Sequence, residues 1–453
     1  MNNLKVKEKS FPKILIFGQP FNNYSGGGIT LTNLFKGWPK DKIAVTYIGH
    51  GLMNVTKDVC DLYYQLGKEE HKWKFPFNLI QREFPSGIKT FDEKKENPVN
   101  IIQKTLRYRI VNTYFYPFIR WIGLFHSLTT ISISQRFEKW LEEFNPEILY
   151  LQVAARDEII FAKELIDYLK IPSVIHVMDD WPTTISNKGL FKNYWSKKID
   201  MEFKSLLDKV DLYLSISDAM SEEYQRRYHK KFIPFHNPIE VELWAPYTKK
   251  DFTINKEYVT VLCSGRIGTN GIAESLMEVA SAIDSMNNGE VNVRLHIQTP
   301  TKNKRILNQL GKYKCIVFNP FAEYKQIPKI FSDADILLLS NDFSALGVKY
   351  LRLSMPTKAS EYMISGAPIM VYTSDQAAVS KFFSLNECGY CVTSQSKKEI
   401  VDAFRYIINN EEYRKKISSN AVNLARARFD AGIVRDEFQK LLVNLIKKDK
   451  NVH

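Results

Sequence analysis

The segment 356–362 places a lysine and a glutamate at a spacing that suits a phosphorylated ligand. Thr357 is a candidate N-cap for a helix that Gly366 can end. Lys358 would then lie in the first turn, where the helix dipole disfavours a cation unless an anion shares the N-terminus. Glu361 would lie about one turn later on the same side. We therefore expect Lys358 to meet a phosphate and Glu361 to accept hydrogen bonds from ribose hydroxyls. An exposed lysine–glutamate pair is the alternative.

Arginine and glycine residues elsewhere supply further phosphate-binding groups. Gly265 and Arg266 follow a predicted strand at 258–263, and parallel sheets bind ligands beyond the carboxyl ends of their strands. Arginine, lysine and helix N-termini commonly hold phosphates, so we expect Arg266 to do so, although a surface arginine would look the same. Gly27 and Gly28 lie in the first strand-to-helix loop, where glycine lets the backbone approach a ligand. They do not match the dinucleotide fingerprint G-x-G-x-x-G.

The elements that would position these residues are strands that alternate with helices. Short apolar runs in the sequence predict buried parallel strands. In the first half, strands are predicted at 13–18, 43–47, 147–152, 173–176 and 210–216, with helices at 29–35 and 158–169. After Asn237-Pro238 and Trp244 the alternation restarts, with strands at 258–263, 291–298, 315–319, 335–339 and 368–372. Such alternation implies parallel sheets with right-handed crossovers. We expect an α/β protein with two doubly wound domains, which a length of 453 residues also favours.

Residues 73–136 do not fit this alternation. No acidic residue occurs from 97 to 135. Apolar residues recur there at helical spacing, at Ile101, Ile102, Leu106, Ile110, Tyr114, Phe115, Phe118 and Ile122, with Lys104, Arg107, Arg109 and Arg120 between them. A basic aromatic amphipathic helix can lie in a membrane interface. Packing on its own domain or on a partner subunit is the alternative.

Composition and charge limit the classes of partner and compartment. The formal net charge of +13 favours anionic ligands or surfaces, but no nucleic-acid-binding motif accompanies it. The five cysteines are odd in number and scattered, so they do not indicate a disulfide framework, and no second pair of ligands has the spacing of a zinc site. Cys388 and Cys391 form a C-x-x-C pair that is either redox-active or simply buried. The polar N-terminus does not resemble a signal peptide, and no apolar run is long enough to span a bilayer. We expect a cytoplasmic protein.

An ordered set of motifs resembles the family 4 retaining glycosyltransferases. The pattern P-T-K-x-x-E-Y-M-x-S-G-x-P-I from Pro356, behind the strand at 334–339, is similar to their C-terminal domain. The glycine loop at 25–28, His176, the segment 211–218, His236-Asn237-Pro238, Ser264-Gly265-Arg266 and the glycine turn at 386–390 agree in order. The resemblance covers nearly the whole chain except about 73–136.

The resemblance implies a GT-B fold, in which two Rossmann-like domains face a central cleft. We expect an N-terminal acceptor-binding domain at 1–245, a C-terminal nucleotide-sugar-binding domain at 246–428 and, at 429–453, a helix that crosses back to the N-terminal domain. His176 would lie near the reaction centre, although a core histidine ending a strand fits equally well; Asp179 or Asp180 would cap the next helix. The candidate catalytic residues are His176, Arg266 and Lys358. The candidate donor-binding residues are Gly27, Gly28, Gly265, Arg266, Thr357, Lys358 and Glu361.

Two positions depart from the family pattern. The family usually carries two glutamates eight positions apart; Glu361 matches the second, but Leu353 stands at the first. The phosphate-loop arginine is usually followed by a lysine before a glycine, whereas Asn270 precedes Gly271 here. We expect Lys358 to supply the second positive charge. The usual contact to the donor sugar is missing or comes from elsewhere.

Together these observations predict a retaining glycosyltransferase that moves a sugar from a nucleoside-diphosphate sugar to a glycan or lipid-linked acceptor in bacterial-type polysaccharide or glycoconjugate synthesis. The resemblance implies no cofactor and no essential metal. It also implies no side-chain base, since the departing phosphate takes the acceptor proton. Residues 97–135 would hold the protein peripherally on the inner face of the plasma membrane. The alternatives are a nucleotide-sugar epimerase or hydrolase on the same fold, and a catalytically inactive GT-B partner subunit.

Overall fold

The computed structural model describes residues 11–52, 55–81, 83–89, 110–254, 257–268, 272–287 and 292–449. The chain divides into two compact units. Unit 1 comprises Met1–Phe235 and Arg435–His453, and unit 2 comprises His236–Val434. Residues 236–245, expected in the N-terminal domain, thus belong to unit 2. Trp244 explains this, because its side chain is fully buried in the unit 2 core, where its ring lies 5.9 Å from that of Phe331.

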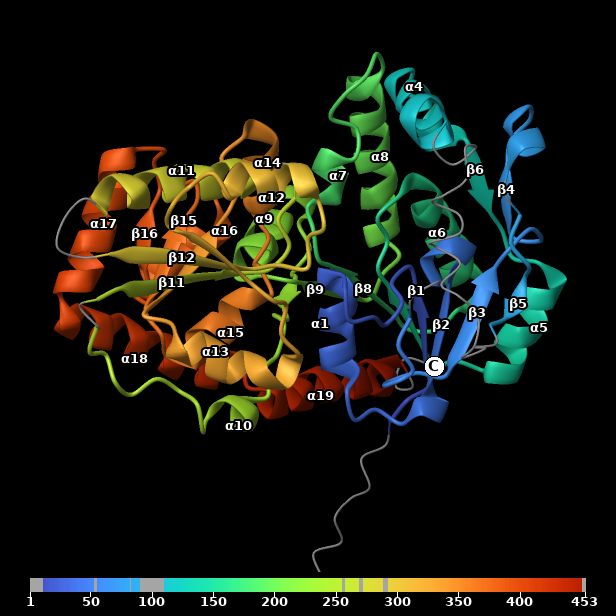
Figure 1. Cartoon of the computed structure of the whole chain (residues 1–453). Helices are drawn as coiled ribbons and strands as arrows, with labels where there is room; N and C mark the ends of the chain where they lie inside the picture. Colours follow the sequence, from blue (N-terminus) through green and yellow to red (C-terminus); the bar gives the residue numbers. More distant parts are fainter. Residues whose placement is uncertain are drawn as a thin grey trace, which may run out of the picture. The chain divides into compact units, whose positions relative to one another are not determined.

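The described part of unit 1 is built on an eight-stranded sheet with the order β10-β9-β8-β7-β1-β2-β3-β5 (Figure 1). Its strands are β1 (Ile14–Phe17), β2 (Ile43–Ile48), β3 (Leu62–Leu66), β5 (Gly87–Ile88), β7 (Ile148–Leu151), β8 (Ser173–Val177), β9 (Leu212–Ser215) and β10 (Ile233–Pro234). All pairs are parallel except β3 with β5. The five strands predicted in this half are confirmed; three of them are buried along their whole length, and β2 and β9 are buried in part.

Helices connect these strands in the alternation that the sequence predicts. They are α1 (Gly26–Phe35), α5 (Gln135–Phe144), α6 (Arg156–Leu169), α7 (Trp181–Thr184), α8 (Lys192–Leu207) and α9 (Asp218–Tyr228). Helix α1 begins at Gly26 rather than Ile29, so the expected glycine loop is part of the helix. Ser25 causes the early start, because its side chain accepts a hydrogen bond from the backbone N–H of Gly28 at 3.1 Å.

The described residues between 71 and 131 form a small addition to unit 1. Strands β4 (His71–Trp73) and β6 (Thr129–Ile131) pair in antiparallel fashion, and η3 (Phe77–Ile80) follows β4. A π-helical turn, η4 (Val111–Phe115), continues into α4 (Tyr116–Trp121), and η5 (Leu124–Ser127) follows. The helical spacing is confirmed from Ile110 to Trp121. Its earlier members Ile101, Ile102, Lys104, Leu106, Arg107 and Arg109 lie outside the described residues.

The described part of unit 2 contains a six-stranded, wholly parallel sheet with the order β13-β12-β11-β14-β15-β16. Its strands are β11 (Val259–Ser264), β12 (Val293–Gln298), β13 (Ile316–Asn319), β14 (Ile336–Ser340), β15 (Ile369–Tyr372) and β16 (Tyr390–Val392). The helices are α10 (Val241–Trp244), α11 (Ile272–Met286), α12 (Lys304–Leu310), α13 (Ile327–Asp333), α14 (Ala345–Leu351), α15 (Lys358–Ser365), α16 (Ala378–Leu385), α17 (Lys397–Asn409) and α18 (Glu411–Arg428). The five strands predicted here are confirmed, as is the doubly wound α/β class.

The last helix, α19 (Ala431–Asp449), starts in unit 2 and contributes its residues from Arg435 onward to unit 1. The ring of Phe438 is fully buried, and its centroid lies 5.1 Å from that of Phe35 and 6.1 Å from that of Tyr150. The Arg435 guanidinium donates a hydrogen bond to the Asn33 carbonyl at 2.7 Å. Among the described helices, none combines the length and the apolar composition that a membrane crossing requires.

Candidate functional site

The carboxyl ends of β11 and β12 are joined by hydrogen bonds around Ser264. The backbone N–H of Ser264 donates to the Tyr362 hydroxyl at 3.0 Å, and its own hydroxyl donates to the Gln298 side-chain carbonyl at 3.0 Å. The next N–H, of Gly265, donates to the Gln298 backbone carbonyl at 2.9 Å. Tyr362 belongs to α15, so this helix is fixed directly against the end of β11.

Lys358 reaches the same strand end. Its ammonium donates to the Ser264 hydroxyl at 3.4 Å and lies 5.6 Å from the centre of the Phe331 ring. The backbone of Gly265 has φ +141°, and a Cβ built there would lie 3.0 Å from Cε of Lys358. The backbone conformation therefore favours glycine, and a Cβ at this position would also press on the end of the lysine side chain. The structure thus brings Lys358 and Ser264-Gly265-Arg266 together, with Arg266 exposed at the end of the strand.

Glu361 completes this group from the next turn of α15. Burial raises the pKa of its carboxyl, while the Lys358 ammonium and the Tyr324 hydroxyl oppose that rise in pKa. Tyr324 lies in η6 (Tyr324–Gln326) and is half exposed. The carboxylate is thus partly buried beside a cation and a hydroxyl. This environment differs from that of an exposed lysine–glutamate pair on a solvated helix.

At the two ends of α15, one sequence prediction is confirmed and one is wrong. Gly366 ends the helix with φ +74°, as predicted. Thr357 occupies the N-cap position, but the prediction that its side chain caps the helix is wrong, because that side chain makes no capping hydrogen bond. Its backbone is already helical, at φ −57° and ψ −28°, whereas a capping side chain needs an extended backbone. Lys358 is the first helical residue, as expected.

Gly27 and Gly28 lie in unit 1, in the first turn of α1, and both contact side chains of their own unit. A Cβ at Gly28 would lie within 2.2–2.4 Å of the Asn22 amide group, and one at Gly27 would lie 3.0 Å from Oε1 of Gln19. The Asn22 carbonyl oxygen in turn accepts hydrogen bonds from the N–H and the hydroxyl of Ser25. Intramolecular packing therefore accounts for both glycines. Their role in ligand binding stays a prediction.

His176 is the penultimate residue of β8 in the core of unit 1, where its side chain is 2% exposed. Its Nδ1 lies 2.6 Å from the hydroxyl of Tyr150. Burial lowers the pKa of His176 to about 3, so the ring is neutral near pH 7. The structure thus has the features of a core histidine, and a role in the reaction stays a prediction.

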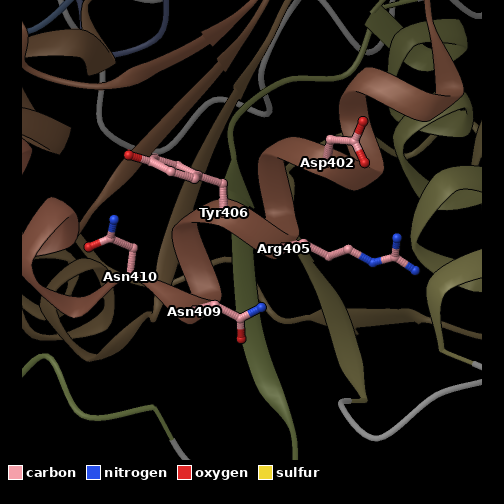
Figure 2. Close-up of a pocket in the computed structure, with 5 residues that line it drawn as sticks. All are labelled: Asp402, Arg405, Tyr406, Asn409 and Asn410. Atoms are coloured by element: carbon pink, nitrogen blue, oxygen red, sulfur yellow. The ribbon is translucent and has the colours of Figure 1, made fainter.

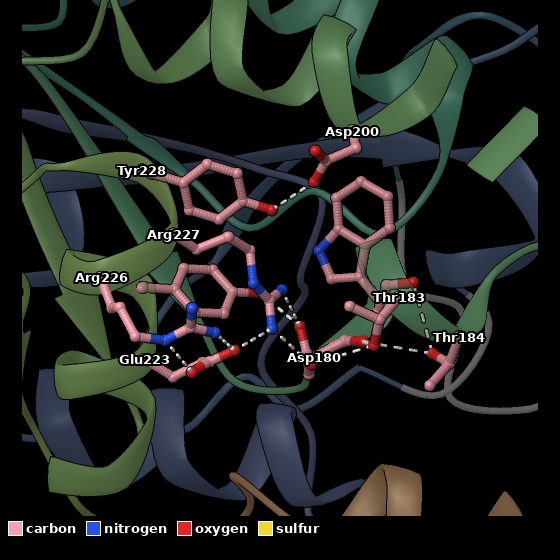
Figure 3. Close-up of polar contacts among 10 residues, drawn as sticks. Asp180, Thr183, Thr184, Asp200, Glu223, Arg226, Arg227 and Tyr228 are labelled. Carbon is pink, nitrogen blue, oxygen red and sulfur yellow. Dashed lines mark hydrogen bonds and ion pairs between the residues drawn. The ribbon is translucent and has the colours of Figure 1, made fainter. Parts of the chain in front are cut away.

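An ion-pair network that the sequence did not reveal surrounds Asp180, which follows β8 in the chain (Figure 3). Asp180, 1% exposed, precedes α7, and its carboxylate accepts hydrogen bonds from Arg227 at 2.8 and 3.2 Å. Arg227 also donates to Glu223 at 2.9 Å. Asp180 occupies the N-cap position of α7 without a capping bond to the backbone, so its carboxylate serves Arg227 and the Thr183 hydroxyl instead. Nothing in the sequence distinguished Arg227 from its exposed neighbour Arg226.

Two further features lie apart from the Lys358 group. A surface depression in unit 2 is lined by Asp402, Arg405, Tyr406, Asn409 and Asn410, from α17 and the start of α18 (Figure 2), and holds none of the expected site residues.

Cys388 and Cys391 are free thiols, and burial raises the pKa of Cys388 to about 12. A redox pair needs a lowered thiol pKa, so this environment favours the buried interpretation.

The match to a known protein family lies in the second half of the chain. Residues 246–424 match the family model of the glycosyl transferases group 1. The predicted resemblance is confirmed. This matched stretch contains Arg266, Lys358 and Glu361, and it supports a glycosyltransferase. No curated protein matches the chain.

Solved structures with low identity share the fold. Sucrose-phosphate synthase from Thermosynechococcus elongatus aligns with a TM-score of 0.60 and 10% identity over 96% of this chain and 99% of that one. HepE of Anabaena in complex with UDP and glucose aligns with a TM-score of 0.57 and 12% identity over 96% and 100%. A Listeria monocytogenes protein assigned as a UDP-N-acetylglucosamine 2-epimerase aligns with a TM-score of 0.50 and 9% identity over 97% and 98%. The chain has the GT-B fold with two Rossmann-like domains.

The Asp180 network yields a prediction with an adjacent control. Arg227→Ala leaves the buried Asp180 carboxylate without this cation, so we expect the free energy of unfolding to fall by about 3–5 kcal/mol. Arg226→Ala removes a side chain that is 72% exposed and pairs with Glu223, so we expect a loss below about 0.5 kcal/mol. Chemical denaturation of the two variants measures both values. Equal losses would show that the network does not stabilise unit 1.

Gly265 yields a second prediction. Gly265→Ala combines an unfavourable backbone conformation with a contact to the Lys358 side chain, and we expect it to cost about 1–3 kcal/mol of unfolding free energy. Gly37→Ala is the control, because Gly37 also has positive φ, at +88°, but nothing lies within 4 Å of its Cβ position. Denaturant titration compares the two. If Gly265→Ala costs no more than Gly37→Ala, the lysine contact is unimportant for stability.

Proposed function

We propose that the protein is a retaining glycosyltransferase that takes a sugar from a nucleoside-diphosphate sugar. The observation that carries the proposal is the grouping of Lys358, Glu361 and Ser264-Gly265-Arg266 at the carboxyl end of β11. In an open parallel sheet this edge is where ligands bind. The group offers two cations for a diphosphate and one carboxylate for vicinal hydroxyls. These groups complement the phosphates and the ribose of a nucleoside diphosphate.

The charges of these residues suggest which part of the donor each one binds. Lys358 and Arg266 would offset the negative charge that develops on the departing diphosphate, the step where fixed donors contribute most to the rate. Glu361 would accept hydrogen bonds from the ribose. HepE, which shares the fold, was solved with UDP-glucose, and this supports a nucleotide-sugar donor here. We propose that transfer occurs with retention, without an essential metal, and that the leaving phosphate takes the acceptor proton.

The acceptor is proposed to be a glycan or a lipid-linked sugar of bacterial-type polysaccharide or glycoconjugate synthesis, reached from the cytoplasmic side of the membrane. The residue at position 353 affects how the donor sugar could be bound. Its side chain is 4% exposed, so the position where the family pattern has a glutamate is occupied by an apolar core residue. We infer that the donor sugar is held by other groups, or that the chain is an inactive partner subunit. Turnover of a donor separates these two.

The donor site is tested by ligand-induced thermal stabilisation. A ligand that binds only the folded state raises its stability, by about 2.7 kcal/mol at one hundred times Kd. In a screen of UDP-, GDP- and dTDP-sugars we expect one class to stabilise the protein. Lys358→Met, Arg266→Ala and Glu361→Gln should each weaken that donor by about tenfold or more, since each removes a charge-assisted hydrogen bond.

Lys312→Met, at an exposed lysine after α12, is the matched control and should leave the donor affinity unchanged. Unchanged affinity and turnover in all three site variants would remove the site assignment, even if a donor still stabilises the protein.

A second candidate activity is nucleotide-sugar epimerisation or hydrolysis, because the assigned epimerase from Listeria shares the fold. Incubation of the stabilising nucleotide sugar without acceptor distinguishes the two. A transferase should leave most of the donor intact over the time in which added acceptor is glycosylated. Free sugar or an epimer as the main product, detected by chromatography, would favour the second candidate.

A further inference from the structure

An exposed aromatic surface on unit 1 joins two segments that are distant in sequence. Its members are Tyr114, Phe118, Trp121, Leu190, Phe191 and Tyr194, each between 51% and 70% exposed. The first three lie on η4 and α4; Leu190 and Phe191 directly precede α8, and Tyr194 lies in its first turn. We call these six residues the aromatic surface. Scattered exposed apolar residues are common, but a cluster of this kind marks an interaction site.

The two halves of the surface are held side by side. The backbone N–H of Leu190 donates to the carbonyl of Trp121 at 2.7 Å. A Cβ at Gly189, where φ is +108°, would lie 2.5 Å from that carbonyl oxygen, so the chain passes α4 at a distance that only glycine allows. Figure 1 shows α4 beside the first turns of α8. The surface is therefore one structural feature made from two segments.

The side chains beneath the aromatic surface are buried, and the Arg156 guanidinium among them is hydrogen-bonded. Ile119 and Trp195 are at most 9% exposed. Arg156 lies over the Trp195 ring at 5.4 Å, makes two hydrogen bonds of 2.7 Å to Glu202, and donates to the His126 carbonyl at 3.1 Å. The six exposed side chains therefore project from a packed and hydrogen-bonded layer.

The two segments that carry the aromatic surface have formal charges of a single sign. The segments 110–128 and 186–199 contain no aspartate or glutamate, and their formal charges come from Arg120, Lys188, Lys192, Lys197 and Lys198. Arg120, Lys188, Lys192 and Lys197 are exposed. Burial and the neighbouring arginines lower the pKa of His126 to about 4, so this residue adds no charge near pH 7. Lys192 opens α8 with no acidic residue in the first turn, where a cation is unfavourable unless an anion is bound nearby.

We propose that the aromatic surface docks on an anionic phospholipid bilayer. Aromatic side chains settle at the level of the lipid headgroups, and lysine and arginine at the rim meet the negative charge of the lipid phosphates. A partner protein of opposite charge would have to supply carboxylates around an apolar centre, whereas a bilayer supplies both without shape complementarity. The sequence predicted membrane contact through 97–135; the structure adds the start of α8. This inference is independent of the transferase assignment.

Co-sedimentation of the full chain with vesicles tests the docking surface. We expect binding to phosphatidylcholine–phosphatidylglycerol vesicles at low salt, and weak binding to phosphatidylcholine alone. Raising the salt should weaken the binding, because the Debye length falls. Lys192→Gln combined with Lys197→Gln should reduce the apparent affinity by about tenfold or more, since each lysine near the surface contributes to attraction.

The apolar part is tested separately by Phe118→Ser combined with Trp121→Ser, which should reduce the affinity by about tenfold or more through lost apolar burial. The control is Leu385→Ser combined with Lys381→Gln on α16, which also removes one exposed apolar and one exposed basic side chain and should bind as the wild type does. Thermal melting verifies that each variant is folded; the charge variant changes only exposed side chains and keeps the test valid if the aromatic variant unfolds.

Three results would overturn the proposal. Equal binding by the wild type and the Lys192/Lys197 variant would remove the role of charge. Equal binding to neutral and anionic vesicles would remove the anionic requirement. Failure to bind either vesicle, together with self-association in sedimentation velocity that Phe118→Ser/Trp121→Ser abolishes, would instead make the surface an interface between copies of the chain.

Discussion

The parallel pairing of the strands, which holds for every described pair of the two large sheets except β3 with β5, is the constraint on which the rest of the structure depends. Parallel strands bring all their carboxyl ends to one edge, and every strand that ends there contributes a loop to the same region. In unit 2 this edge joins Ser264 and Gln298 from adjacent strands, and α15 is fixed against it by the Tyr362 hydroxyl. Lys358 and Arg266, 92 residues apart in sequence (358 minus 266), are neighbours of one strand end for this reason.

The strands and the class of fold were predictable because they depend on local patterns. An apolar run such as Ile14–Phe17 is typical of a strand that is buried on both faces of a parallel sheet, and this run is fully buried. The helix at Lys358 and its end at Gly366 were predictable for a similar reason, since first-turn and C-cap preferences are local. The exact start of α1 was missed because Ser25, and not the glycines, determines it.

Features that depend on tertiary contacts were not predictable. Arg226 and Arg227 are adjacent and identical in type, yet one is exposed and the other bridges Asp180 and Glu223. The side-chain cap expected of Thr357 failed because the chain enters α15 already in a helical conformation. The aromatic surface needed the second segment at 190–194, whose proximity to α4 rests on a hydrogen bond between residues 69 positions apart (190 minus 121). Periodicity along one segment carries no information about such a neighbour.

Helix α19 makes unit 1 discontinuous in sequence, since this unit is assembled from the first 235 residues and the last 19. Phe438 fills the space between Phe35, Tyr150 and Phe235. A fragment that stops after unit 1's first segment would therefore expose an aromatic cavity in its core. Evolutionary exchange of unit 1 between proteins thus requires two breakpoints, and a domain library built by single cuts would miss it. Joining the old termini and opening the chain between the units would instead give each unit one continuous segment.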